Sequence, residues 1–344
     1  MKKLLTILAA CTLSVSLAAC STGGDKPKDP VTPAEEKVLG IVMPNATHGF
    51  TGESIKHAEA AANLLADEKD ITVKFLTSAE ASEQNNQIDT LVNEKVDCIV
   101  LWPHNGDELR SAAMKVMEAE IPLIIYDRLI EDFAPTAEIM GDNETIGKMT
   151  GEYFNKYFTD DLAAGKVNIL EFKGDNSTVP EQRSSGFAST MNANINIVQQ
   201  FSTDWQRAKA MEQMETYLNN TAQEEVEALR GVFTHDDEVL LGVIDAIKGY
   251  KGPASLNVNL LSGVGGRKEN LEIFDSVKEE LNIDQVTYSF SPTMVRDAVT
   301  KGVEVIEGKE VKGLILIATE EIDNTNYKEF MKGETWKIRY ESGI

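Results

Sequence analysis

Cysteine is scarce in this chain, whose 344 residues include only Cys11, Cys20 and Cys98. Cys11 and Cys20 lie in the N-terminal segment, and Cys98 sits in an apolar run where a small core residue is the simplest interpretation. This set cannot form a disulfide framework, so the fold must depend on a hydrophobic core. The hydrophobic content of 42% is that of an ordinary globular protein.

Positive charge is also in short supply. The chain has 33 Lys and Arg against 56 Asp and Glu, a formal net charge of −23. Nucleic-acid binding requires a basic surface, so this excess of acid argues against a nucleic-acid partner. A repressor would need a basic helix-turn-helix arm at its N-terminus, where this chain has an apolar segment instead. We interpret the acidity as a solubility feature.

The common catalytic motifs are missing as well: the chain has no GxSxG, HExxH or paired-cysteine pattern. The glycines of 263–266 could expose backbone amides to a phosphate, but they form neither a GxGxxG nor a Walker pattern and come late in the chain. Acids and arginines therefore remain without an identifiable nucleophile or base. The sequence predicts a binding protein, not an enzyme, with no cofactor.

The N-terminus has the order of a secretory signal. Lys2 and Lys3 precede an apolar run over 4–17, which ends in small residues. This run is shorter than the ~20 apolar residues of a membrane-spanning helix. Leu17-Ala18-Ala19-Cys20 resembles a bacterial lipobox, in which the cysteine is lipidated and becomes the mature N-terminus. A similar sequence ends at Cys11, but the apolar run before it is too short.

The next segment has the composition of a flexible linker. Residues 21–36 contain three prolines and two glycines, with one valine as their only large apolar side chain. Such a segment cannot bury enough surface to fold and stays an extended linker. We expect a signal peptide over 1–19, lipidated Cys20 with its linker over 20–36, and an extracytoplasmic protein anchored to the cell membrane. Whether that place is a Gram-positive surface or a Gram-negative periplasm is left open.

From residue 37 onward, short apolar stretches alternate with amphipathic ones. Two consecutive series of this kind predict two doubly wound α/β lobes, because strands that are apolar on both faces form parallel sheets covered on each side. The expected strands are 38–43, 71–76, 97–101, 123–126, 167–172, 195–200, 231–234, 256–262, 286–290 and 314–317. The expected helices are 50–65, 80–93, 109–119, 146–157, 183–193, 205–219, 239–250, 269–281 and 293–307.

Ligands of such sheets bind beyond the carboxyl ends of the strands. Aromatic rings, carboxylates and arginines gather in the segments expected there, which are 44–50, 102–106, 127–128, 175–183, 204–205, 235–238, 263–266 and 289–292. This mixture suits a sugar, because C–H faces pack on rings and each hydroxyl can both donate and accept a hydrogen bond. A few charge-assisted hydrogen bonds of about 1.5–3 kcal/mol each would give micromolar binding.

The order and the amino-acid sequences of several segments resemble those of a known family. They are 84–89 (QNNQID), 96–100 (VDCIV), 121–128 (IPLIIYDR), Asp142-Asn143 and 236–238 (DDE). Together they look like the ribose/xylose/galactose-type sugar-binding proteins of bacterial ABC importers, from residue 37 to about 318. The segments 103–106 (PHNG) and 126–130 (YDRLI) look most like xylose-binding members. The resemblance implies a type I periplasmic-binding fold whose two lobes meet at three hinge crossings, near 141–143, 290–292 and 317–320.

The resemblance also implies positions for ligand contacts. They are Asp127, Arg128, Arg183, Trp205 and Asp236, with Phe50 as a stacking ring and Thr47 or His48 beside it. Three positions depart from the family pattern: Trp102 replaces a polar residue, Gly265 an aspartate and Phe290 a glutamine. These departures disfavour ribose and make the cleft more aromatic. No calcium loop of the galactose type is found, so no metal is expected.

Simpler structural roles compete at several of these positions. Asp127 and Arg128 could form a local ion pair, Arg183 could open a helix, and Trp205 could be a hydrophobic staple at a helix start. Phe50 and Phe290 could be core residues, and lone histidines such as His48 and His104 are usually surface or satisfied residues. The acids of 236–238 look like a metal cluster, but at a helix start an N-cap role ranks first, with Asp236 alone as the ligand candidate.

The resulting expectation is a membrane-tethered solute receptor that closes on a monosaccharide, xylose-like by preference, and delivers it to an ABC permease. The lobes would comprise 37–141 with 292–318, and 142–291 with 319–344. A nucleoside or furanone-type signal is the alternative ligand, and a sugar-processing enzyme is the alternative of another class. Whether a chemoreceptor also recognises the closed state is left open.

Overall fold

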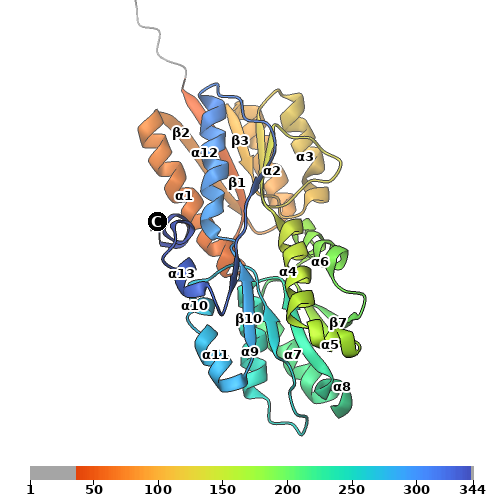
Figure 1. Ribbon diagram of the computed structural model, residues 1–344. Coiled ribbons are helices and arrows are strands. Elements are labelled where there is room, and N and C mark those ends of the chain that lie inside the picture. Colours follow the sequence, from red (N-terminus) through yellow and green to blue (C-terminus); the bar gives the residue numbers. More distant parts are fainter. Residues whose placement is uncertain (1–35, 342–344) are drawn as a thin grey trace, which may run out of the picture. The chain divides into compact units, whose positions relative to one another are not determined.

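The computed structural model describes residues 36–341, which form two lobes, each built on a six-stranded sheet (Figure 1). The expected pair of doubly wound α/β lobes is confirmed. In the first sheet, all strands are parallel and their order is β11 (Gly313–Ile317), β5 (Ala137–Gly141), β4 (Leu123–Tyr126), β3 (Cys98–Leu101), β1 (Lys37–Pro44) and β2 (Ile71–Ser78).

The second sheet has the same plan with one exception at its edge. Its order is β12 (Glu321–Asp323), β10 (Asp284–Tyr288), β9 (Leu260–Ser262), β8 (Leu229–Thr234), β6 (Val167–Lys173) and β7 (Ile195–Ser202). Strand β12 runs antiparallel to β10, whereas the other pairs are parallel. The C-terminal strand therefore closes the edge of a sheet that the sequence pattern predicted to be parallel throughout.

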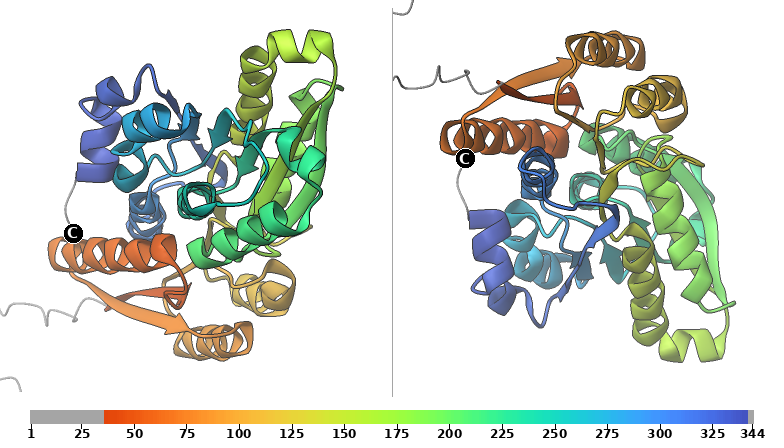
Figure 2. Two further views of the ribbon diagram at one scale, coloured as in Figure 1. Left: turned by 90° about the horizontal axis from the view of Figure 1, so that it is seen from below. Right: turned by 90° about the horizontal axis from the view of Figure 1, so that it is seen from above.

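Helices cover both faces of each sheet (Figure 2). In the first lobe, α1 (Gly49–Lys69) and α12 (Val295–Ile306) pack on one face, and α2 (Ala81–Glu94) and α3 (Gly106–Glu118) on the other. In the second lobe, α4 (Asn143–Tyr157) pairs with α6 (Thr178–Thr190), and α7 (Arg207–Asn220) with α9 (Asp237–Gly249). The shorter helices are α5 (Thr159–Ala164), α8 (Gln223–Glu227), α10 (Lys268–Leu271), α11 (Phe274–Leu281), α13 (Tyr327–Phe330) and α14 (Glu334–Trp336), with η1 (Pro292–Met294) and η2 (Lys337–Glu341).

Double-sided burial explains the apolar strands. Every residue of β3 and β4 is buried, and Cys98 is a free cysteine within that core. Apolar side chains on both faces of a strand are stable only when helices cover both faces, which is the arrangement observed. The role expected for Cys98 as a small core residue is confirmed.

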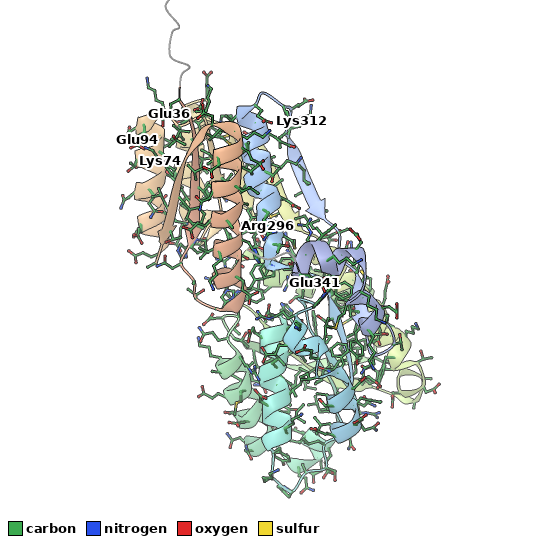
Figure 3. The ribbon with its side chains drawn as sticks, turned by 90° about the vertical axis from the view of Figure 1, so that its left-hand side faces the viewer. Glu36, Lys74, Glu94, Arg296, Lys312 and Glu341 are labelled. Carbon is green, nitrogen blue, oxygen red and sulfur yellow. The ribbon has the colours of Figure 1, made fainter. Side chains whose placement is uncertain are left out.

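The chain passes between the two sheets three times. It leaves β5 of the first sheet for α4, leaves β10 of the second sheet for α12, and leaves β11 of the first sheet for β12. Because all strands except β12 run parallel within their sheets, their carboxyl ends lie at these crossings. Figure 3 shows Glu36 and Lys312 at the opposite end of the first sheet.

The C-terminal segment returns from the second sheet to α12. Arg339 forms a two-pronged ion pair with Asp297, with distances of 3.1 and 2.7 Å, and its carbonyl oxygen accepts hydrogen bonds from Ser291 and Thr293. The Tyr340 hydroxyl donates to the Gly265 carbonyl at 2.5 Å. The segment thus ties the second crossing to both lobes.

Several expected element boundaries are wrong. Strand β5 was not expected, and α6 begins at Thr178, five residues before Arg183. Of the strand expected over 256–262, only β9 forms, and β10 ends at Tyr288. The helix expected over 269–281 is interrupted into α10 and α11. These segments are short or lack strong periodicity, so tertiary contacts decide their structure.

The signal, Cys20 and all of the linker up to residue 35 lie outside the described residues. Within 36–341, no helix is long and apolar enough to cross a membrane.

Candidate functional site

A cavity of about 360 Å³, partly open to solvent, lies where the strand carboxyl ends of the two lobes face one another. Nine of the eleven predicted ligand contacts line it, together with Val179, which the sequence did not indicate. The lining residues are His48, Phe50, Trp102, Asp127, Arg128, Val179, Arg183, Trp205, Asp236 and Phe290.

Thr47 and Gly265 are the two predicted contacts that do not line the cavity. Thr47 is exposed, and its backbone N–H donates to Thr51 Oγ1 at 3.1 Å. Gly265 is buried, and its carbonyl oxygen accepts from Phe290 N and from the Tyr340 hydroxyl. Gly265 therefore supports the wall behind Phe290 through its backbone.

Aromatic rings form a continuous wall on the side of the first lobe. Phe50 stands edge-on to Trp102 at 6.0 Å between ring centres, and Trp102 stands edge-on to Tyr126 at 5.2 Å. Phe290, at the second crossing, lies 5.4 Å from Phe50. Such edge-to-face pairs stabilise one another by roughly 0.5–1.5 kcal/mol beyond their burial. Phe50 and Phe290 are thus both core residues and cavity residues.

Asp127 is presented to the cavity by a tight turn. Its φ of +66° is left-handed, and the Arg128 N–H donates to the Tyr126 carbonyl at 2.8 Å across it. This i to i+2 bond defines a γ-turn, a strained conformation that aspartate tolerates better than most residues. Asp127 is 7% exposed as a residue, and burial raises the pKa of its carboxylate, whereas Arg128 and Arg183 lower it.

The hydrogen-bonding capacity around Asp127 is largely unused. Among the described residues, its carboxylate accepts no hydrogen bond, and its nearest ionic partner is Arg128 Nε at 4.0 Å. The Trp102 ring nitrogen is close enough to lower the pKa of Asp127, yet it makes no hydrogen bond and is buried without a partner, as is Arg128 Nε. Buried polar groups are normally paired, so this cluster points to a ligand rich in donors and acceptors.

Arg128 connects the two lobes instead of pairing locally with Asp127. Its Nη1 donates to the His104 carbonyl at 2.6 Å, and its Nη2 forms an ion pair of 2.8 Å with Asp175, which follows β6 of the second lobe. Nearby, the Leu129 N–H donates to Thr178 Oγ1 at 3.2 Å. Burial alone would raise the pKa of Asp175, but Arg128 and Ser177 lower it. These contacts belong to an arrangement in which the lobes are closed on each other.

Arg183 is the cationic centre on the side of the second lobe. It lies in the second turn of α6, is 2% exposed, and its guanidinium sits 4.7 Å from the centre of the Phe290 ring and 5.7 Å from that of Trp205. Its Nε donates to Asn143 Oδ1 at 3.0 Å, and its Nη1 donates to the His235 carbonyl. Because α6 begins at Thr178, the alternative that Arg183 merely opens a helix is wrong.

Trp205 reaches the cavity from a tight turn. Gln206 N donates to the Thr203 carbonyl at 3.0 Å, and the two central residues, Asp204 and Trp205, both have positive φ, of 49° and 62°. Two left-handed residues in succession define a type I′ turn, which disfavours a large side chain at its centre. Helix α7 begins only at Arg207, so Trp205 is presented by the turn that precedes the helix.

Asp236 combines the two roles that the sequence allowed. Its side chain accepts from Glu238 N at 2.7 Å, which confirms the N-cap interpretation, and it also lines the cavity. Burial, with the neighbouring Asp237, raises the pKa of Asp236 to about 7. Asp237 instead turns inward and accepts from Thr287 Oγ1 and Arg267 N. No group of three or more His, Cys, Asp or Glu residues within 36–341 is placed to hold a metal ion.

His48 completes the rim next to the arginines. It caps the start of α1, and its ring lies 6.4 Å from that of Trp205. Burial, followed by the charge of Arg128, lowers its pKa to about 4. At neutral pH the ring is therefore uncharged, and it offers one donor and one acceptor nitrogen.

The sequence contained a signal for Asp175 that was not used. Asp175 opens the segment 175–183, which is expected beyond the end of the strand over 167–172, so the rule that ligand sites lie beyond strand ends applies to it as well as to Arg183. Val179 gave no such signal, because a valine near a helix start is ordinary in any α/β protein.

Comparison with known proteins identifies the family. Residues 39–310 match the family described as "Periplasmic binding protein domain". The chain is 24% identical to the fructose import binding protein FruE of Bifidobacterium longum, over 97% of this chain and 98% of that protein. It is 23% identical to the ribose import binding protein RbsB of Bacillus subtilis, over 69% and 72% of the two chains.

Solved structures agree on the fold. A protein from Mycobacterium smegmatis in complex with β-D-fucofuranose superimposes with a TM-score of 0.74 at 21% identity, covering 88% of this chain and 96% of that one. A solute-binding protein of an ABC transporter from Bacillus halodurans, with bound myo-inositol, gives a TM-score of 0.73 at 21% identity over 86% and 98%. The family match spans most of the residues that form both lobes and their cavity, so this chain belongs to the periplasmic binding protein domain family.

Proposed function

We propose that this protein binds a monosaccharide in the cavity between its lobes and delivers it to the permease of an ABC transporter. The observation that carries the proposal is the convergence of aromatic rings with charged groups from both lobes on one cavity. The names of the relatives support it: besides those that import ribose and fructose, one is a galactofuranose-binding protein of Escherichia coli, 27% identical over 58% of this chain and 64% of that protein.

The chemistry of the cavity fits a sugar ring. Phe50, Phe290 and Trp205 offer apolar faces to C–H groups, while Asp127 accepts from hydroxyls and Arg183 donates to them. The guanidinium of Arg183 keeps its charge at neutral pH, because burial lowers its pKa only to about 10. Each charge-assisted hydrogen bond in so closed a site contributes about 1.5–3 kcal/mol.

A pentose or a hexose is the proposed ligand class, with a xylose-like sugar preferred. The segments 103–106 and 126–130 support this preference, since His104 and Pro103 hold Arg128 through their carbonyl oxygens. A nucleoside or furanone-type ligand is the competing outcome, because the aromatic wall would also stack on a planar ring.

Isothermal titration calorimetry tests this proposal with D-xylose, D-ribose, D-fructose, D-galactose, myo-inositol and adenosine. We expect micromolar binding of at least one sugar, with an increase in stability of about 2.7 kcal/mol at a hundred times its dissociation constant. Recovery of the unchanged sugar distinguishes a receptor from an enzyme. Binding of adenosine alone, or conversion of the sugar, would overturn the proposal.

We also propose that the lobes close about their three crossings. Lobe closure would bring Asp127 and Arg128 toward Arg183 and Asp236, so a ligand that contacts both pairs favours the closed form. Small-angle X-ray scattering should then show a smaller radius of gyration at saturating sugar. An unchanged radius would indicate a cavity that is closed before the ligand binds.

Lipid anchoring at Cys20 belongs to the same proposal and rests on Leu17-Ala18-Ala19-Cys20 alone. The Cys20→Ser variant should leave the membrane fraction almost completely, because stable anchoring requires more than one acyl chain. The Cys11→Ser variant is the matched control and should stay anchored. The reverse result would assign the anchor to Cys11.

A further inference from the structure

Two rings of the cavity rest directly on glycines. Gly174 immediately follows β6, and a Cβ atom built on it would lie far closer than 3.0 Å to Cε2 and Cζ2 of Trp205. Gly141 ends β5 at the first crossing, and a Cβ atom there would lie equally close to Cε2 of Phe290. Real Cβ atoms essentially never approach a neighbour within 3.0 Å, so any side chain at either position must displace the ring.

Backbone conformation does not explain these two glycines. Positive φ values between 63° and 150° occur at Gly265, Gly266, Gly308 and Gly313, but not at Gly141 or Gly174. A residue with a side chain could therefore adopt the same backbone at both positions. What the glycines provide is close approach of the ring to the main chain.

The direction in which the rings could move is set by their surroundings. Trp205 is held by its type I′ turn, and the Asp204 N–H donates to the Gly174 carbonyl at 3.2 Å, so the turn and the glycine are fixed to each other. The guanidinium of Arg183 lies against both Trp205 and Phe290. A ring pushed away from its glycine would press against Arg183 and into the cavity that these side chains line.

We propose that Gly174 and Gly141 are positioning residues that determine ligand size, because they hold Trp205 and Phe290 far enough back for the cavity to admit a complete sugar ring. The inference rests on the proposed function and deepens it by assigning the width of the cavity to two positions that are not among its lining residues. It predicts that adding one methyl group at either position narrows the cavity and excludes larger sugars before smaller ones.

The test compares Gly174→Ala and Gly141→Ala with the wild-type protein, purified with its natural N-terminus. Calorimetry with D-xylose and D-glucose, which share a pyranose ring and differ by one hydroxymethyl group, measures size selectivity. We expect the ratio of the two affinities to shift toward D-xylose by about tenfold or more, the range found when a pocket discriminates a single carbon unit. Gly174→Ala is also made in a Trp205→Leu background, where no ring is left to displace, and there it should leave the affinity ratio the same as in Trp205→Leu alone.

Two glycine controls separate positioning from packing. Gly249→Ala at the end of α9 adds a methyl group in open space, since nothing lies within 4 Å, and should leave the affinity ratio unchanged. Gly151→Ala in α4 places a Cβ against Thr190 on α6, away from the cavity, and should lower the melting temperature without changing the affinity ratio. If Gly174→Ala behaves like Gly151→Ala, with lower stability and an unchanged ratio, the inference is overturned.

A ligand-free readout keeps this test independent of the proposed function. Crystal structures of the unliganded Gly174→Ala and Gly141→Ala variants should show Trp205 and Phe290 displaced into the cavity. Rings that stay in place would overturn the inference even if the wild-type protein binds sugars. Conversely, a wild-type protein that binds no sugar would overturn the proposed function, while displaced rings would still support the positioning role of the two glycines.

Discussion

The two lobes contribute to the cavity in different ways. In the second lobe, the charged groups are already held by the protein: Arg183 donates to Asn143 and His235, and Asp236 caps α9. In the first lobe, Asp127 accepts no hydrogen bond among the described residues, and the Trp102 ring nitrogen is buried without a partner. One half of the cavity is therefore preorganised, and the other half has capacity left for a ligand.

This difference between the lobes predicts which side chains contribute to ligand affinity alone and which also contribute to the stability of the fold. A buried polar group without a partner costs about 1–3 kcal/mol, which a ligand that supplies the partner recovers. Asp127 and Trp102 should therefore contribute mainly to affinity. Arg183 should contribute to both affinity and stability, because its removal also leaves Asn143 Oδ1 and the His235 carbonyl without their donor.

The network behind Arg183 supports this division. The His235 ring lies 3.0 Å from Glu171, and both side chains are buried in the core of the second lobe. Burial alone would raise the pKa of Glu171, but hydrogen bonds from His235, Ser184 and Gln200 lower it to about 2. This fixed network holds the backbone of His235, and through its carbonyl it orients Arg183.

The largest effect is expected for Arg183→Met, which keeps an unbranched side chain but removes every donor. We predict that sugar affinity falls more than a hundredfold and that the melting temperature also falls, because charge-assisted contacts and two protein hydrogen bonds are lost together. Calorimetry for binding and differential scanning calorimetry for unfolding measure the two effects.

Arg207→Met on α7 is the matched control. Arg207 pairs with Asp245 and Glu269 in a partly exposed position outside the cavity, so both binding and stability should change little. If Arg183→Met loses affinity without any loss of stability, the second lobe is not preorganised in the way described here.

Asp127→Asn should produce an intermediate effect and affect binding alone. The substitution weakens one acceptor for sugar hydroxyls, so affinity should fall about ten- to a hundredfold. Burial raises the pKa of Asp127, so the folded protein loses stability as the pH rises and this carboxyl ionises. Removing the charge should therefore leave the melting temperature at pH 7 unchanged or raise it.

Asp132→Asn provides the control for this variant. Asp132 is also an aspartate with left-handed φ, of 49°, but it is exposed and lies outside the cavity lining. The Asp132→Asn variant should leave the sugar affinity and the melting temperature unchanged. A lower melting temperature with unaltered affinity in Asp127→Asn would make Asp127 a structural residue of the γ-turn.

Most of the fold could be predicted because its core strands have a strong local signal. Strands β3 and β4 are apolar on both faces, which only a covered parallel sheet satisfies. Strand β5 was missed since Glu138 interrupts its apolar pattern, and the start of α6 was missed because its first turn contains a proline and polar residues. Such segments adopt their structure through long-range pairing, which a local pattern does not encode.

The site could be predicted as a set of positions but not as a geometry. Strand ends indicated Asp127, Arg183 and Trp205, and the structure brings these side chains to one cavity. The pairing of Arg128 with Asp175 could not be foreseen, because it joins turns of different lobes and depends on how the lobes meet. The close approach of Trp205 to Gly174 depends on a turn conformation that is unusual for tryptophan, so its sequence offered no warning.

The smallest effect on stability concerns Asp236 and depends on pH. Its pKa is raised from 3.8 to about 7 in the folded protein by burial and by Asp237, although Arg267 and Arg183 oppose the shift. A carboxyl whose folded pKa is raised binds its proton more tightly when folded, so stability is lost as the pH rises from about 4 to about 7. The wild-type protein should therefore carry this penalty in full at pH 8.

Asp236→Asn removes the penalty and keeps the cap, because asparagine is as good an N-cap residue as aspartate. We predict that the variant melts a few degrees above the wild-type protein at pH 8 and that the two melt together near pH 4. The sugar affinity of this variant should also fall, because the negative charge of wild-type Asp236 contributes to ligand binding although it lowers stability. Differential scanning calorimetry of both proteins between pH 4 and pH 8 measures this effect. If the difference between their melting temperatures does not vary with pH, Asp236 acts only as an N-cap. The second lobe would then contribute a single charged group, Arg183, to the cavity.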